Sequence, residues 1–314
     1  MLLFYDGCLI KKCTADHQDK NKMMKNWPIL IVVIISIALA CCQEVKAEQI
    51  IKSYKTTQIP QVDGLETEDV WKNIEAVTTI DPIAQVEIKI KSVYSDTTIF
   101  FLVIFPDKDE SRTHRSWIWN EEEKMYDEGP DREDVFVFKW KLDETIRDLS
   151  VFSDETYEAD IWYWKACRTD PQGYADDKIQ RLFNYPAKES FEVTSKSGHK
   201  MYIQRQGDTG RSAYKTNIFI DYKGDVVQRY TLRQPQSSRA DVRAKGVWKD
   251  GRWTIEFARA LFTGNRDDVH FQTVNKSYGF GVSRYEIAGR PPEKSDQPLF
   301  GSGDITEILT LEFQ

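Results

Sequence analysis

The chain is poor in cysteine and contains none of the cysteine motifs that hold metals or covalent cofactors. Only five cysteines occur in 314 residues, and four of them, Cys8, Cys13, Cys41 and Cys42, precede residue 48. No Cys-x-x-Cys-His sequence is present, which excludes a covalently attached c-type haem, and zinc or iron–sulfur cysteine spacings are also missing. Residues 48–314 keep Cys167 alone, so they have no internal disulfide and depend on a packed core.

Excess positive charge and catalytic motifs are missing as well. The formal net charge is −7, which argues against a nucleic-acid partner. The sequence has no Gly-x-Ser-x-Gly, no His-Glu-x-x-His and no phosphate-binding loop. Beyond residue 48 the histidines are His114, His199 and His270, scattered along the chain, which fits single hydrogen bonds better than a paired bis-histidine site. We therefore predict that the chain is not itself an enzyme.

The chain has a single long apolar run, Trp27–Cys42. At sixteen residues it is short for a membrane span, which needs about 20. Lysines precede it, and Val45-Lys46-Ala47 follows with small residues where a signal peptidase cleaves. The pattern predicts a signal peptide at about 23–47, hence export, with no stable membrane span after cleavage. A retained anchor or a lipid-modified Cys41 are the alternatives. The expected organisation is an N-terminal extension with signal peptide over 1–47 and one domain over 48–314.

A long helical stripe of apolar residues is also absent, and short runs of β-branched and aromatic residues take its place. We expect strands at 86–91, 99–105, 135–140, 161–164, 217–222, 227–232, 253–257, 269–274, 278–282 and 307–313. Asp250-Gly251 between two such runs is typical of a tight hairpin turn. The predicted fold is all-β, an antiparallel β-sandwich, with long loops at Asp107–Asp134 and Thr169–Tyr214.

The segment Asp160–Asp177 is the most unusual in composition. It places Trp162, Tyr163 and Trp164 directly before a turn-rich stretch, which suggests a strand end that covers a cavity or a partner surface. The pairs Asp176-Asp177 and Asp267-Asp268 fit either oxygen ligands of a cation such as calcium or exposed turn carboxylates.

Several of these segments together resemble the haem-binding domain of the ethylbenzene dehydrogenase gamma subunit and its cytochrome c-552 and dimethyl sulfoxide reductase-like relatives. The marks are Val62-Asp63-Gly64 with Trp71, Asp134–Trp140, Asp160–Asp177, and Ala244–Trp248 with Asp250–Trp253, Arg259 and Asp267-Asp268-Val269. Val62–Trp71 looks like the opening of carbohydrate-binding-module-like sandwiches. The resemblance spans about Ile59 to Phe313.

The resemblance implies a periplasmic electron-transfer subunit that binds one haem b. Such subunits assemble with a molybdenum catalytic subunit and an iron–sulfur subunit and exchange electrons with a soluble cytochrome. It also implies Met and Lys as iron ligands, with Lys245 as the lysine; the alternative is an ordinary strand lysine with its amine in solvent. We expect Trp162, Trp164 and Trp248 to form the apolar wall of the cofactor site.

The methionine is where the sequence departs from the family. Leu149–Tyr157, where the ligand is expected, holds neither Met nor His nor Cys. Met125 is the candidate second ligand; a solvent-facing or gap-filling Met is the alternative. This departure leaves two further interpretations open: a haem-free subunit that serves assembly of the same kind of complex, and a carbohydrate-binding module.

Overall fold

The computed structural model describes residues 49–81, 85–272, 276–284, 304–305 and 307–314. The chain divides into two units, 1–47 and 48–314, and the described residues belong to the second. The expected signal peptide at 23–47 lies outside the described residues. Within those residues, no helix is long and apolar enough to cross a membrane.

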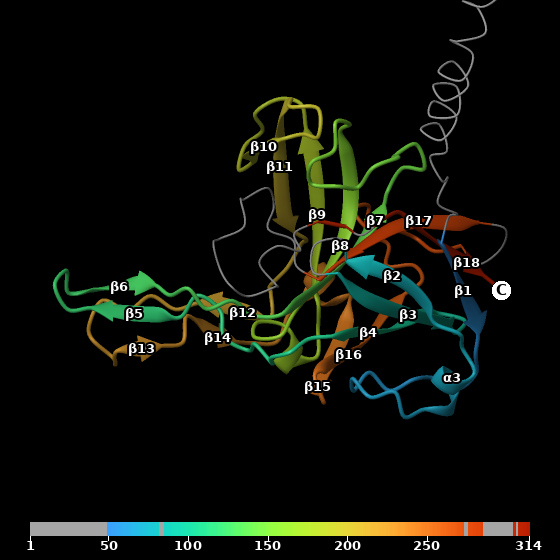
Figure 1. Ribbon diagram of the computed structural model, residues 1–314, viewed down its shortest axis with the longest axis horizontal. Helices are drawn as coiled ribbons and strands as arrows, with labels where there is room; N and C mark the ends of the chain where they lie inside the picture. The colour runs from blue at the N-terminus through green and yellow to red at the C-terminus, as the bar shows by residue number, and fades with distance from the viewer. Residues whose placement is uncertain (1–48, 82–84, 273–275, 285–303, 306) are drawn as a thin grey trace, which may run out of the picture. The chain divides into compact units, whose positions relative to one another are not determined.

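One continuous thirteen-stranded sheet forms the body of the protein (Figure 1). Its first half contains β10 (Phe191–Thr194), β11 (Lys200–Gly207), β9 (Asp176–Phe183), β8 (Tyr157–Lys165), β7 (Val135–Lys141) and β17 (Ser277–Ser283). Its second half contains β1 (Gln49–Lys55), β2 (Val77–Asp81), β3 (Val86–Tyr94), β4 (Thr98–Pro106), β16 (Arg252–Ala260) and β15 (Arg243–Lys249). Strand β18 (Leu309–Phe313) joins the halves between β17 and β1.

The two halves face one another and enclose an aromatic core. Phe101 on β4 lies 5.0 Å from Phe138 on β7 between ring centroids, although β4 and β7 are not neighbours in the sheet. Phe138 in turn lies 5.1 Å from Phe257 on β16. Both halves bury these rings completely, so the predicted all-β sandwich is confirmed.

The sheet is mixed rather than purely antiparallel. Strand β1 pairs in parallel with β18 and with β3, while the other pairings are antiparallel. The first and last strands of the described chain are thus neighbours, and pairing between distant segments of this kind leaves no local sequence signal.

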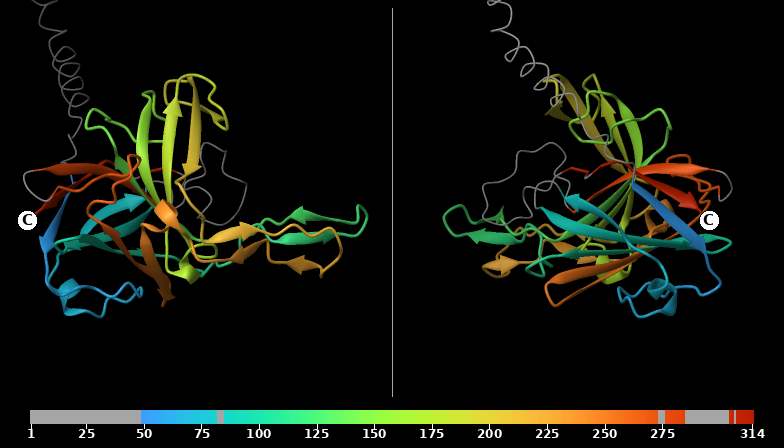
Figure 2. Two further views of the ribbon diagram at one scale, coloured as in Figure 1. Left: turned by 180° about the vertical axis from the view of Figure 1, so that it is seen from behind. Right: turned by 45° about the vertical axis from the view of Figure 1, so that its right-hand side comes forward.

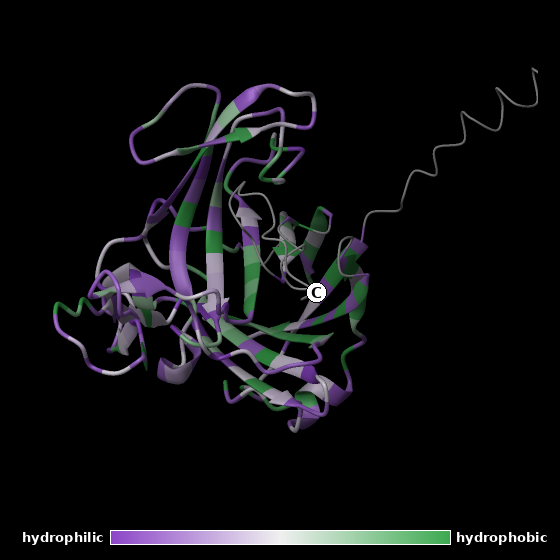
Figure 3. Cartoon of the chain, turned by 60° about the vertical axis from the view of Figure 1, so that its left-hand side comes forward, coloured by the Kyte–Doolittle hydropathy of each residue, from purple (hydrophilic) through white to green (hydrophobic). Residues whose placement is uncertain are grey.

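Most of the expected strands form because alternating residues face the core. Figure 3 shows hydrophobic and hydrophilic residues as alternating bands along the strands. The Asp250-Gly251 turn is confirmed: both residues have positive φ, 52° and 75°, and join β15 to β16. Short helical turns complete the body: α3 (Asp69–Lys72), η1 (Asp170–Gln172) and η2 (Ser237–Ala240).

Two expected strands were wrong. Residues 217–222 are not a strand, whereas β13 (Val226–Val227) pairs with the edge of β5 (Trp117–Asn120). Residues 269–272 are irregular too, since the Val269 amide donates to the Asp160 carboxylate and Arg259 donates to the Val269 carbonyl. Residues 273–275 lie outside the described part of the chain.

Both expected long loops contain strands. Thr169–Tyr214 includes β9, β10 and β11. These strands bury polar residues, such as Asp176 and Gln180, and a sequence rich in polar residues is typical of a loop. Asp107–Asp134 includes the hairpin of β5 and β6 (Met125–Glu128). This hairpin, β13, β12 (Tyr214–Thr216) and β14 (Tyr230–Leu232) form a region that we call the arm, which extends from the sandwich in each view of Figures 1 and 2.

Candidate functional site

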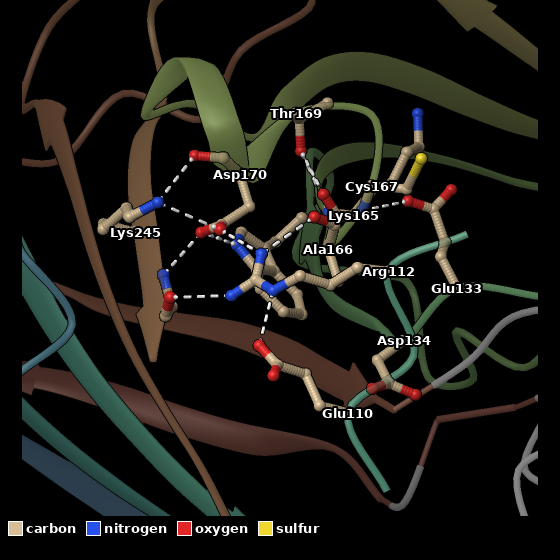
Figure 4. Close-up of polar contacts among 12 residues, drawn as sticks. Glu110, Arg112, Glu133, Asp134, Lys165, Ala166, Cys167, Thr169, Asp170 and Lys245 are labelled. Carbon is tan, nitrogen blue, oxygen red and sulfur yellow. Dashed lines mark hydrogen bonds and ion pairs between the residues drawn. The ribbon is translucent and has the colours of Figure 1, made fainter. Parts of the chain in front are cut away.

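A buried carboxylate, Asp170, is the centre of a polar network beside β15 (Figure 4). Its Oδ1 accepts hydrogen bonds from Trp164 Nε1 at 3.0 Å and from the Gly246 amide at 2.6 Å. Its Oδ2 accepts from Arg112 Nη1 at 2.7 Å and from Lys245 Nζ at 3.1 Å. Four donors from three parts of the chain, the segment before β7, β8 and β15, compensate the desolvation of this carboxylate.

The local sequence Thr169-Asp170-Pro171-Gln172-Gly173 places this carboxylate. Strand β8 ends at Lys165, and the Thr169 hydroxyl accepts a hydrogen bond from the Lys165 amide at 2.9 Å. Pro171 stands at the start of the η1 turn, and Gly173 closes it with a φ of 79°, a conformation that favours glycine. The turn therefore carries Asp170 back over β8 toward Trp164 and β15.

Arg112 connects the network to the core and to the surface. Its Nε donates to Glu110 at 2.5 Å, its Nη1 also donates to the Ala166 carbonyl at 3.0 Å, and its guanidinium lies 4.9 Å from the Trp253 ring centroid. A planar, permanently charged group suits this combination of ion pairing and ring contact. Arg112 therefore holds the residues after β8 against β16.

A cavity of about 220 Å³ adjoins the network at the base of the arm. Its lining comprises Arg112, Thr113, His114, Ser116, Ala166, Cys167, Pro171, Gln228, Arg229, Tyr230 and Leu232. Burial and the Glu133 charge raise the pKa of the Cys167 thiol to about 12, and burial with nearby Arg168 lowers the pKa of His114. The cavity therefore offers a neutral thiol and a neutral imidazole, a poor set for nucleophilic catalysis.

Glu133 fastens the segment that lines this cavity. Its carboxylate accepts from the Cys167 amide at 2.7 Å, from the Arg168 amide at 3.0 Å and from Arg168 Nε. His114 Nδ1 lies 3.6 Å from the same carboxylate. These contacts are structural: they hold residues 166–168 against the segment before β7.

The three tryptophans that we expected to form a cofactor wall do not line this cavity. Trp162 and Trp164 are fully buried in the aromatic core, and Trp164 packs 4.9 Å from Trp253. Trp248 is partly buried and donates from Nε1 to the Asp107 carbonyl at 3.0 Å. Fully buried rings cannot stack on a sugar either.

The two expected iron ligands are not brought together. Lys245 lies on β15, and its ammonium is paired with Asp170. Met125 begins β6 on the arm and is 51% exposed. Figure 1 shows β6 and β15 in separate regions of the protein.

The residues present do not fit a haem b held by Lys245 and Met125. The Lys245 amine, which would have to face the iron, is instead directed at Asp170, with Nζ 3.1 Å from its carboxylate. The space between the sheets is filled by the protein's own rings, and the 220 Å³ cavity is below the usual range of about 300–1,000 Å³ for small-molecule sites.

Sequence reasoning missed Asp170, Arg112 and Glu133. Asp170 had a local signal, because Asp-Pro-x-Gly is a turn sequence directly after the aromatic strand. Arg112 and Glu133 had none, since they stand in a charged stretch where any of several residues could have turned inward.

We predict a pH-dependent effect of substituting Asp134, which is buried and accepts from Trp253 Nε1 at 3.0 Å and from the Ser111 amide at 2.8 Å. Burial and the nearby Asp107 charge raise its pKa to about 7. A raised folded-state pKa means that the folded protein holds the Asp134 proton more tightly than the unfolded chain does. The free energy of unfolding is therefore highest at low pH and falls as the pH rises from about 4 to about 7.

The variant Asp134→Asn keeps an acceptor and stays neutral. Relative to wild type it should gain about 1–3 kcal/mol in unfolding free energy on going from pH about 4 to pH about 8. Urea unfolding at both pH values measures this. A stability difference that does not change with pH would contradict the prediction.

One of three comparisons with known proteins places the chain in a family. The model of the ethylbenzene dehydrogenase family matches residues 68–290. A search of curated proteins finds no match. Among solved structures, a carbohydrate binding module family 9 from Caldicellulosiruptor kristjanssonii in complex with glucose aligns at 13% identity and a TM-score of 0.34, over 84% of this chain and 95% of that chain. A module of the same description in complex with cellotriose aligns at 13% identity and a TM-score of 0.34, over 85% and 95%. Similarity at this level carries no information about ligands.

The fold and the site define an all-β sandwich protein whose buried polar network joins its strands. The family match covers well over half of the sequence, so the chain belongs to the ethylbenzene dehydrogenase family. The expected family resemblance is thus confirmed.

Proposed function

We propose that this chain is an accessory subunit of an oxidoreductase complex of the ethylbenzene dehydrogenase type, and that it binds a catalytic partner subunit through its arm. Family membership supports the complex. The exposed apolar surface of the arm is the observation that supports the mode of binding.

The arm exposes large apolar side chains that its own small sheets cannot cover. Ile218 is 83% exposed and Ile220 is 89% exposed. Between them, Phe219 lies 5.9 Å from the Tyr126 ring, so residues alternate between an inner aromatic cluster and an outer apolar face. We call Ile218 and Ile220 the arm patch; the other exposed large apolar side chains of the arm are Ile118, Met125, Tyr222 and Val226. Patches of this kind mark protein–protein contacts.

The surroundings of the arm patch match an interface with another protein. The turn that joins β5 to β6 carries Glu121, Glu122 and Glu123, all exposed. An apolar centre with a charged rim is the usual anatomy of an interface, and acidic residues at the rim favour a partner with basic residues there. We assign the partner role to the catalytic subunit, which the exported domain would meet in the periplasm.

The proposed subunit contains no haem. This proposal is supported by the ion pair between Lys245 and Asp170 and by the aromatic side chains that fill the space between the sheets. The competing proposal is an electron-transfer subunit with one haem b beside molybdenum and iron–sulfur subunits; family membership alone supports it.

A difference spectrum separates these proposals. We expect purified wild-type protein, and protein incubated with haemin, to show no Soret band that shifts on reduction with dithionite. A shifting band that disappears in Lys245→Ala would overturn the haem-free proposal and support electron transfer.

Loss of partner binding is the expected result of charging the arm patch. The double variant Ile218→Asp, Ile220→Asp places two charges at the centre of the interface, where binding would remove their water. It should reduce the amount of catalytic subunit that copurifies at least about 100-fold. The readout is molybdenum content per tagged subunit after mild extraction from the native cell. Ile80→Asp, at a residue 50% exposed on β2, is the matched control. A wild-type protein that purifies as a monomer without molybdenum would contradict the proposal.

A further inference from the structure

A second group of carboxylates lies buried within the sandwich, away from the contacts of Asp170. Asp160 is on β8, Asp177 is on β9, and Asp268 is in the segment after β16. One carboxylate oxygen from each residue lies within 4.8 Å of the others, and all three residues are buried.

The strand register accounts for this convergence. In the antiparallel pairing of β8 with β9, Trp162 stands opposite Asp177 and Asp160 stands opposite Ile179. Side chains two residues apart share a face, so Asp160 and Asp177 are diagonal neighbours on one face of the sheet. Asp268 reaches them because the next residue, Val269, donates its amide to Asp160 at 3.0 Å.

Arg259 is the cation that pairs with this group in the described part of the chain. Its Nη1 donates to Asp160 Oδ2 at 2.6 Å, and its Nη2 lies 4.0 Å from Asp268 Oδ2. One guanidinium against three carboxylates leaves two negative charges without compensation when all three are ionised. Uncompensated charge is costly at such depth.

Several oxygens of the group also lack hydrogen-bond donors among the described residues. Both carboxylate oxygens of Asp177 are unpartnered, although the residue is 0% exposed. The same holds for Oδ1 of Asp160 and Oδ1 of Asp268. Asp208 is buried beside them, with its amide 3.3 Å from the Asp177 carbonyl, and its Oδ1 is unpartnered too. Buried oxygens of this kind require an explanation.

We propose that Asp160, Asp177 and Asp268 bind a divalent cation of the calcium type. The donors are carboxylate oxygens throughout, which are the ligands of a hard cation, and Ca²⁺ accepts six to eight oxygens in a flexible geometry. Asp177 offers two unpartnered oxygens, Asp160 and Asp268 offer one each, and water completes the coordination. A divalent charge equals the deficit that Arg259 leaves.

The cation has a structural role in this proposal, which does not depend on the proposed function. It joins β8, β9 and the segment that begins after β16, three parts of the chain that otherwise meet with like charges. Binding to the folded state alone raises stability with ligand concentration.

Calcium titration of the full chain tests the site. At free Ca²⁺ about 100-fold above the dissociation constant, we expect the Tm of EDTA-treated wild-type protein to rise by about 5–10 °C. Asp177→Asn should abolish this rise. Glu158→Gln, at an exposed carboxylate on the neighbouring strand β8, removes equal charge and should keep the rise.

Terbium luminescence on wild-type protein is a second measurement that does not need the variant to fold. Trp162 donates from Nε1 to Asp160 at 3.3 Å, so its ring is placed to sensitise a bound Tb³⁺ ion, and Ca²⁺ should displace the ion and remove the emission. A Tm that does not change with Ca²⁺, together with no sensitised emission, would overturn the proposal. The charge of the Asp177 carboxylate would then be neutralised by a bound proton.

Discussion

Replacement of Asp170 by alanine should lower stability more than any other single change in the polar network. The substitution leaves Trp164 Nε1, the Gly246 amide and part of Arg112 without their acceptor in a buried place. Each buried donor left without an acceptor costs about 1–3 kcal/mol, and Trp164 and Gly246 supply two, whereas Arg112 and Lys245 are partly exposed to solvent. For a domain of this size the expected fall in Tm is about 10 °C or more, measured by thermal unfolding.

Two further variants define what the carboxylate contributes. Asp170→Asn keeps an acceptor for the Trp164 and Gly246 donors but removes the charge opposite Arg112 and Lys245, so its Tm should be intermediate. Asp221→Ala, an exposed aspartate on the arm, is the control and should unfold like wild type. Equal Tm values for Asp170→Ala and wild type would show that the network is not structural.

The second large effect is expected at Phe138, in the middle of the aromatic core. Its ring centroid lies 5.0 Å from Phe101, 5.1 Å from Phe257 and 5.3 Å from Phe136. Truncation of a buried phenylalanine to alanine lowers the free energy of unfolding by about 3–5 kcal/mol. Part of this is the lost transfer free energy of the ring, and part is the cost of the cavity that remains. Chemical denaturation of Phe138→Ala measures this loss.

The same variant reports on the interior that a cofactor would need. A dry cavity lined by aromatic rings should bind a small apolar ligand such as benzene, which would recover part of the lost Tm. Phe262→Ala, at a ring 69% exposed, is the control and should cost little. If the two variants lose similar stability, the space between the sheets is not tightly filled, and the argument against a bound porphyrin fails with it.

Much of the fold could be predicted because strand signals are local. The runs at 86–91, 99–105 and 135–140 alternate or are continuously apolar, and each is a strand with apolar side chains buried in the core. The strand prediction failed where the buried residues are polar. Strand β9 buries Asp176 against Lys165 at 2.6 Å, and no apolar pattern marks such a strand.

The candidate site was less predictable than the fold. The sequence drew attention to Trp162, Trp164 and Lys245, and these residues do lie close to buried carboxylates. It could not show that the tryptophans face inward while Lys245 is held by Asp170, nor that Met125 stands on the arm. The separation along the chain explains this: Lys245 and Asp170 are 75 residues apart.

By itself the sequence determined that this protein is an all-β sandwich with an aromatic core, because side-chain alternation and turn residues act over a few positions. Only the tertiary structure decided which charges meet inside it. Arg259 and Asp160 are 99 residues apart, and Trp253 and Asp134 are 119 apart. Such contacts depend on strand register and on how the two halves of the sheet face each other, and both arise from the cooperative packing of the whole chain rather than from any segment.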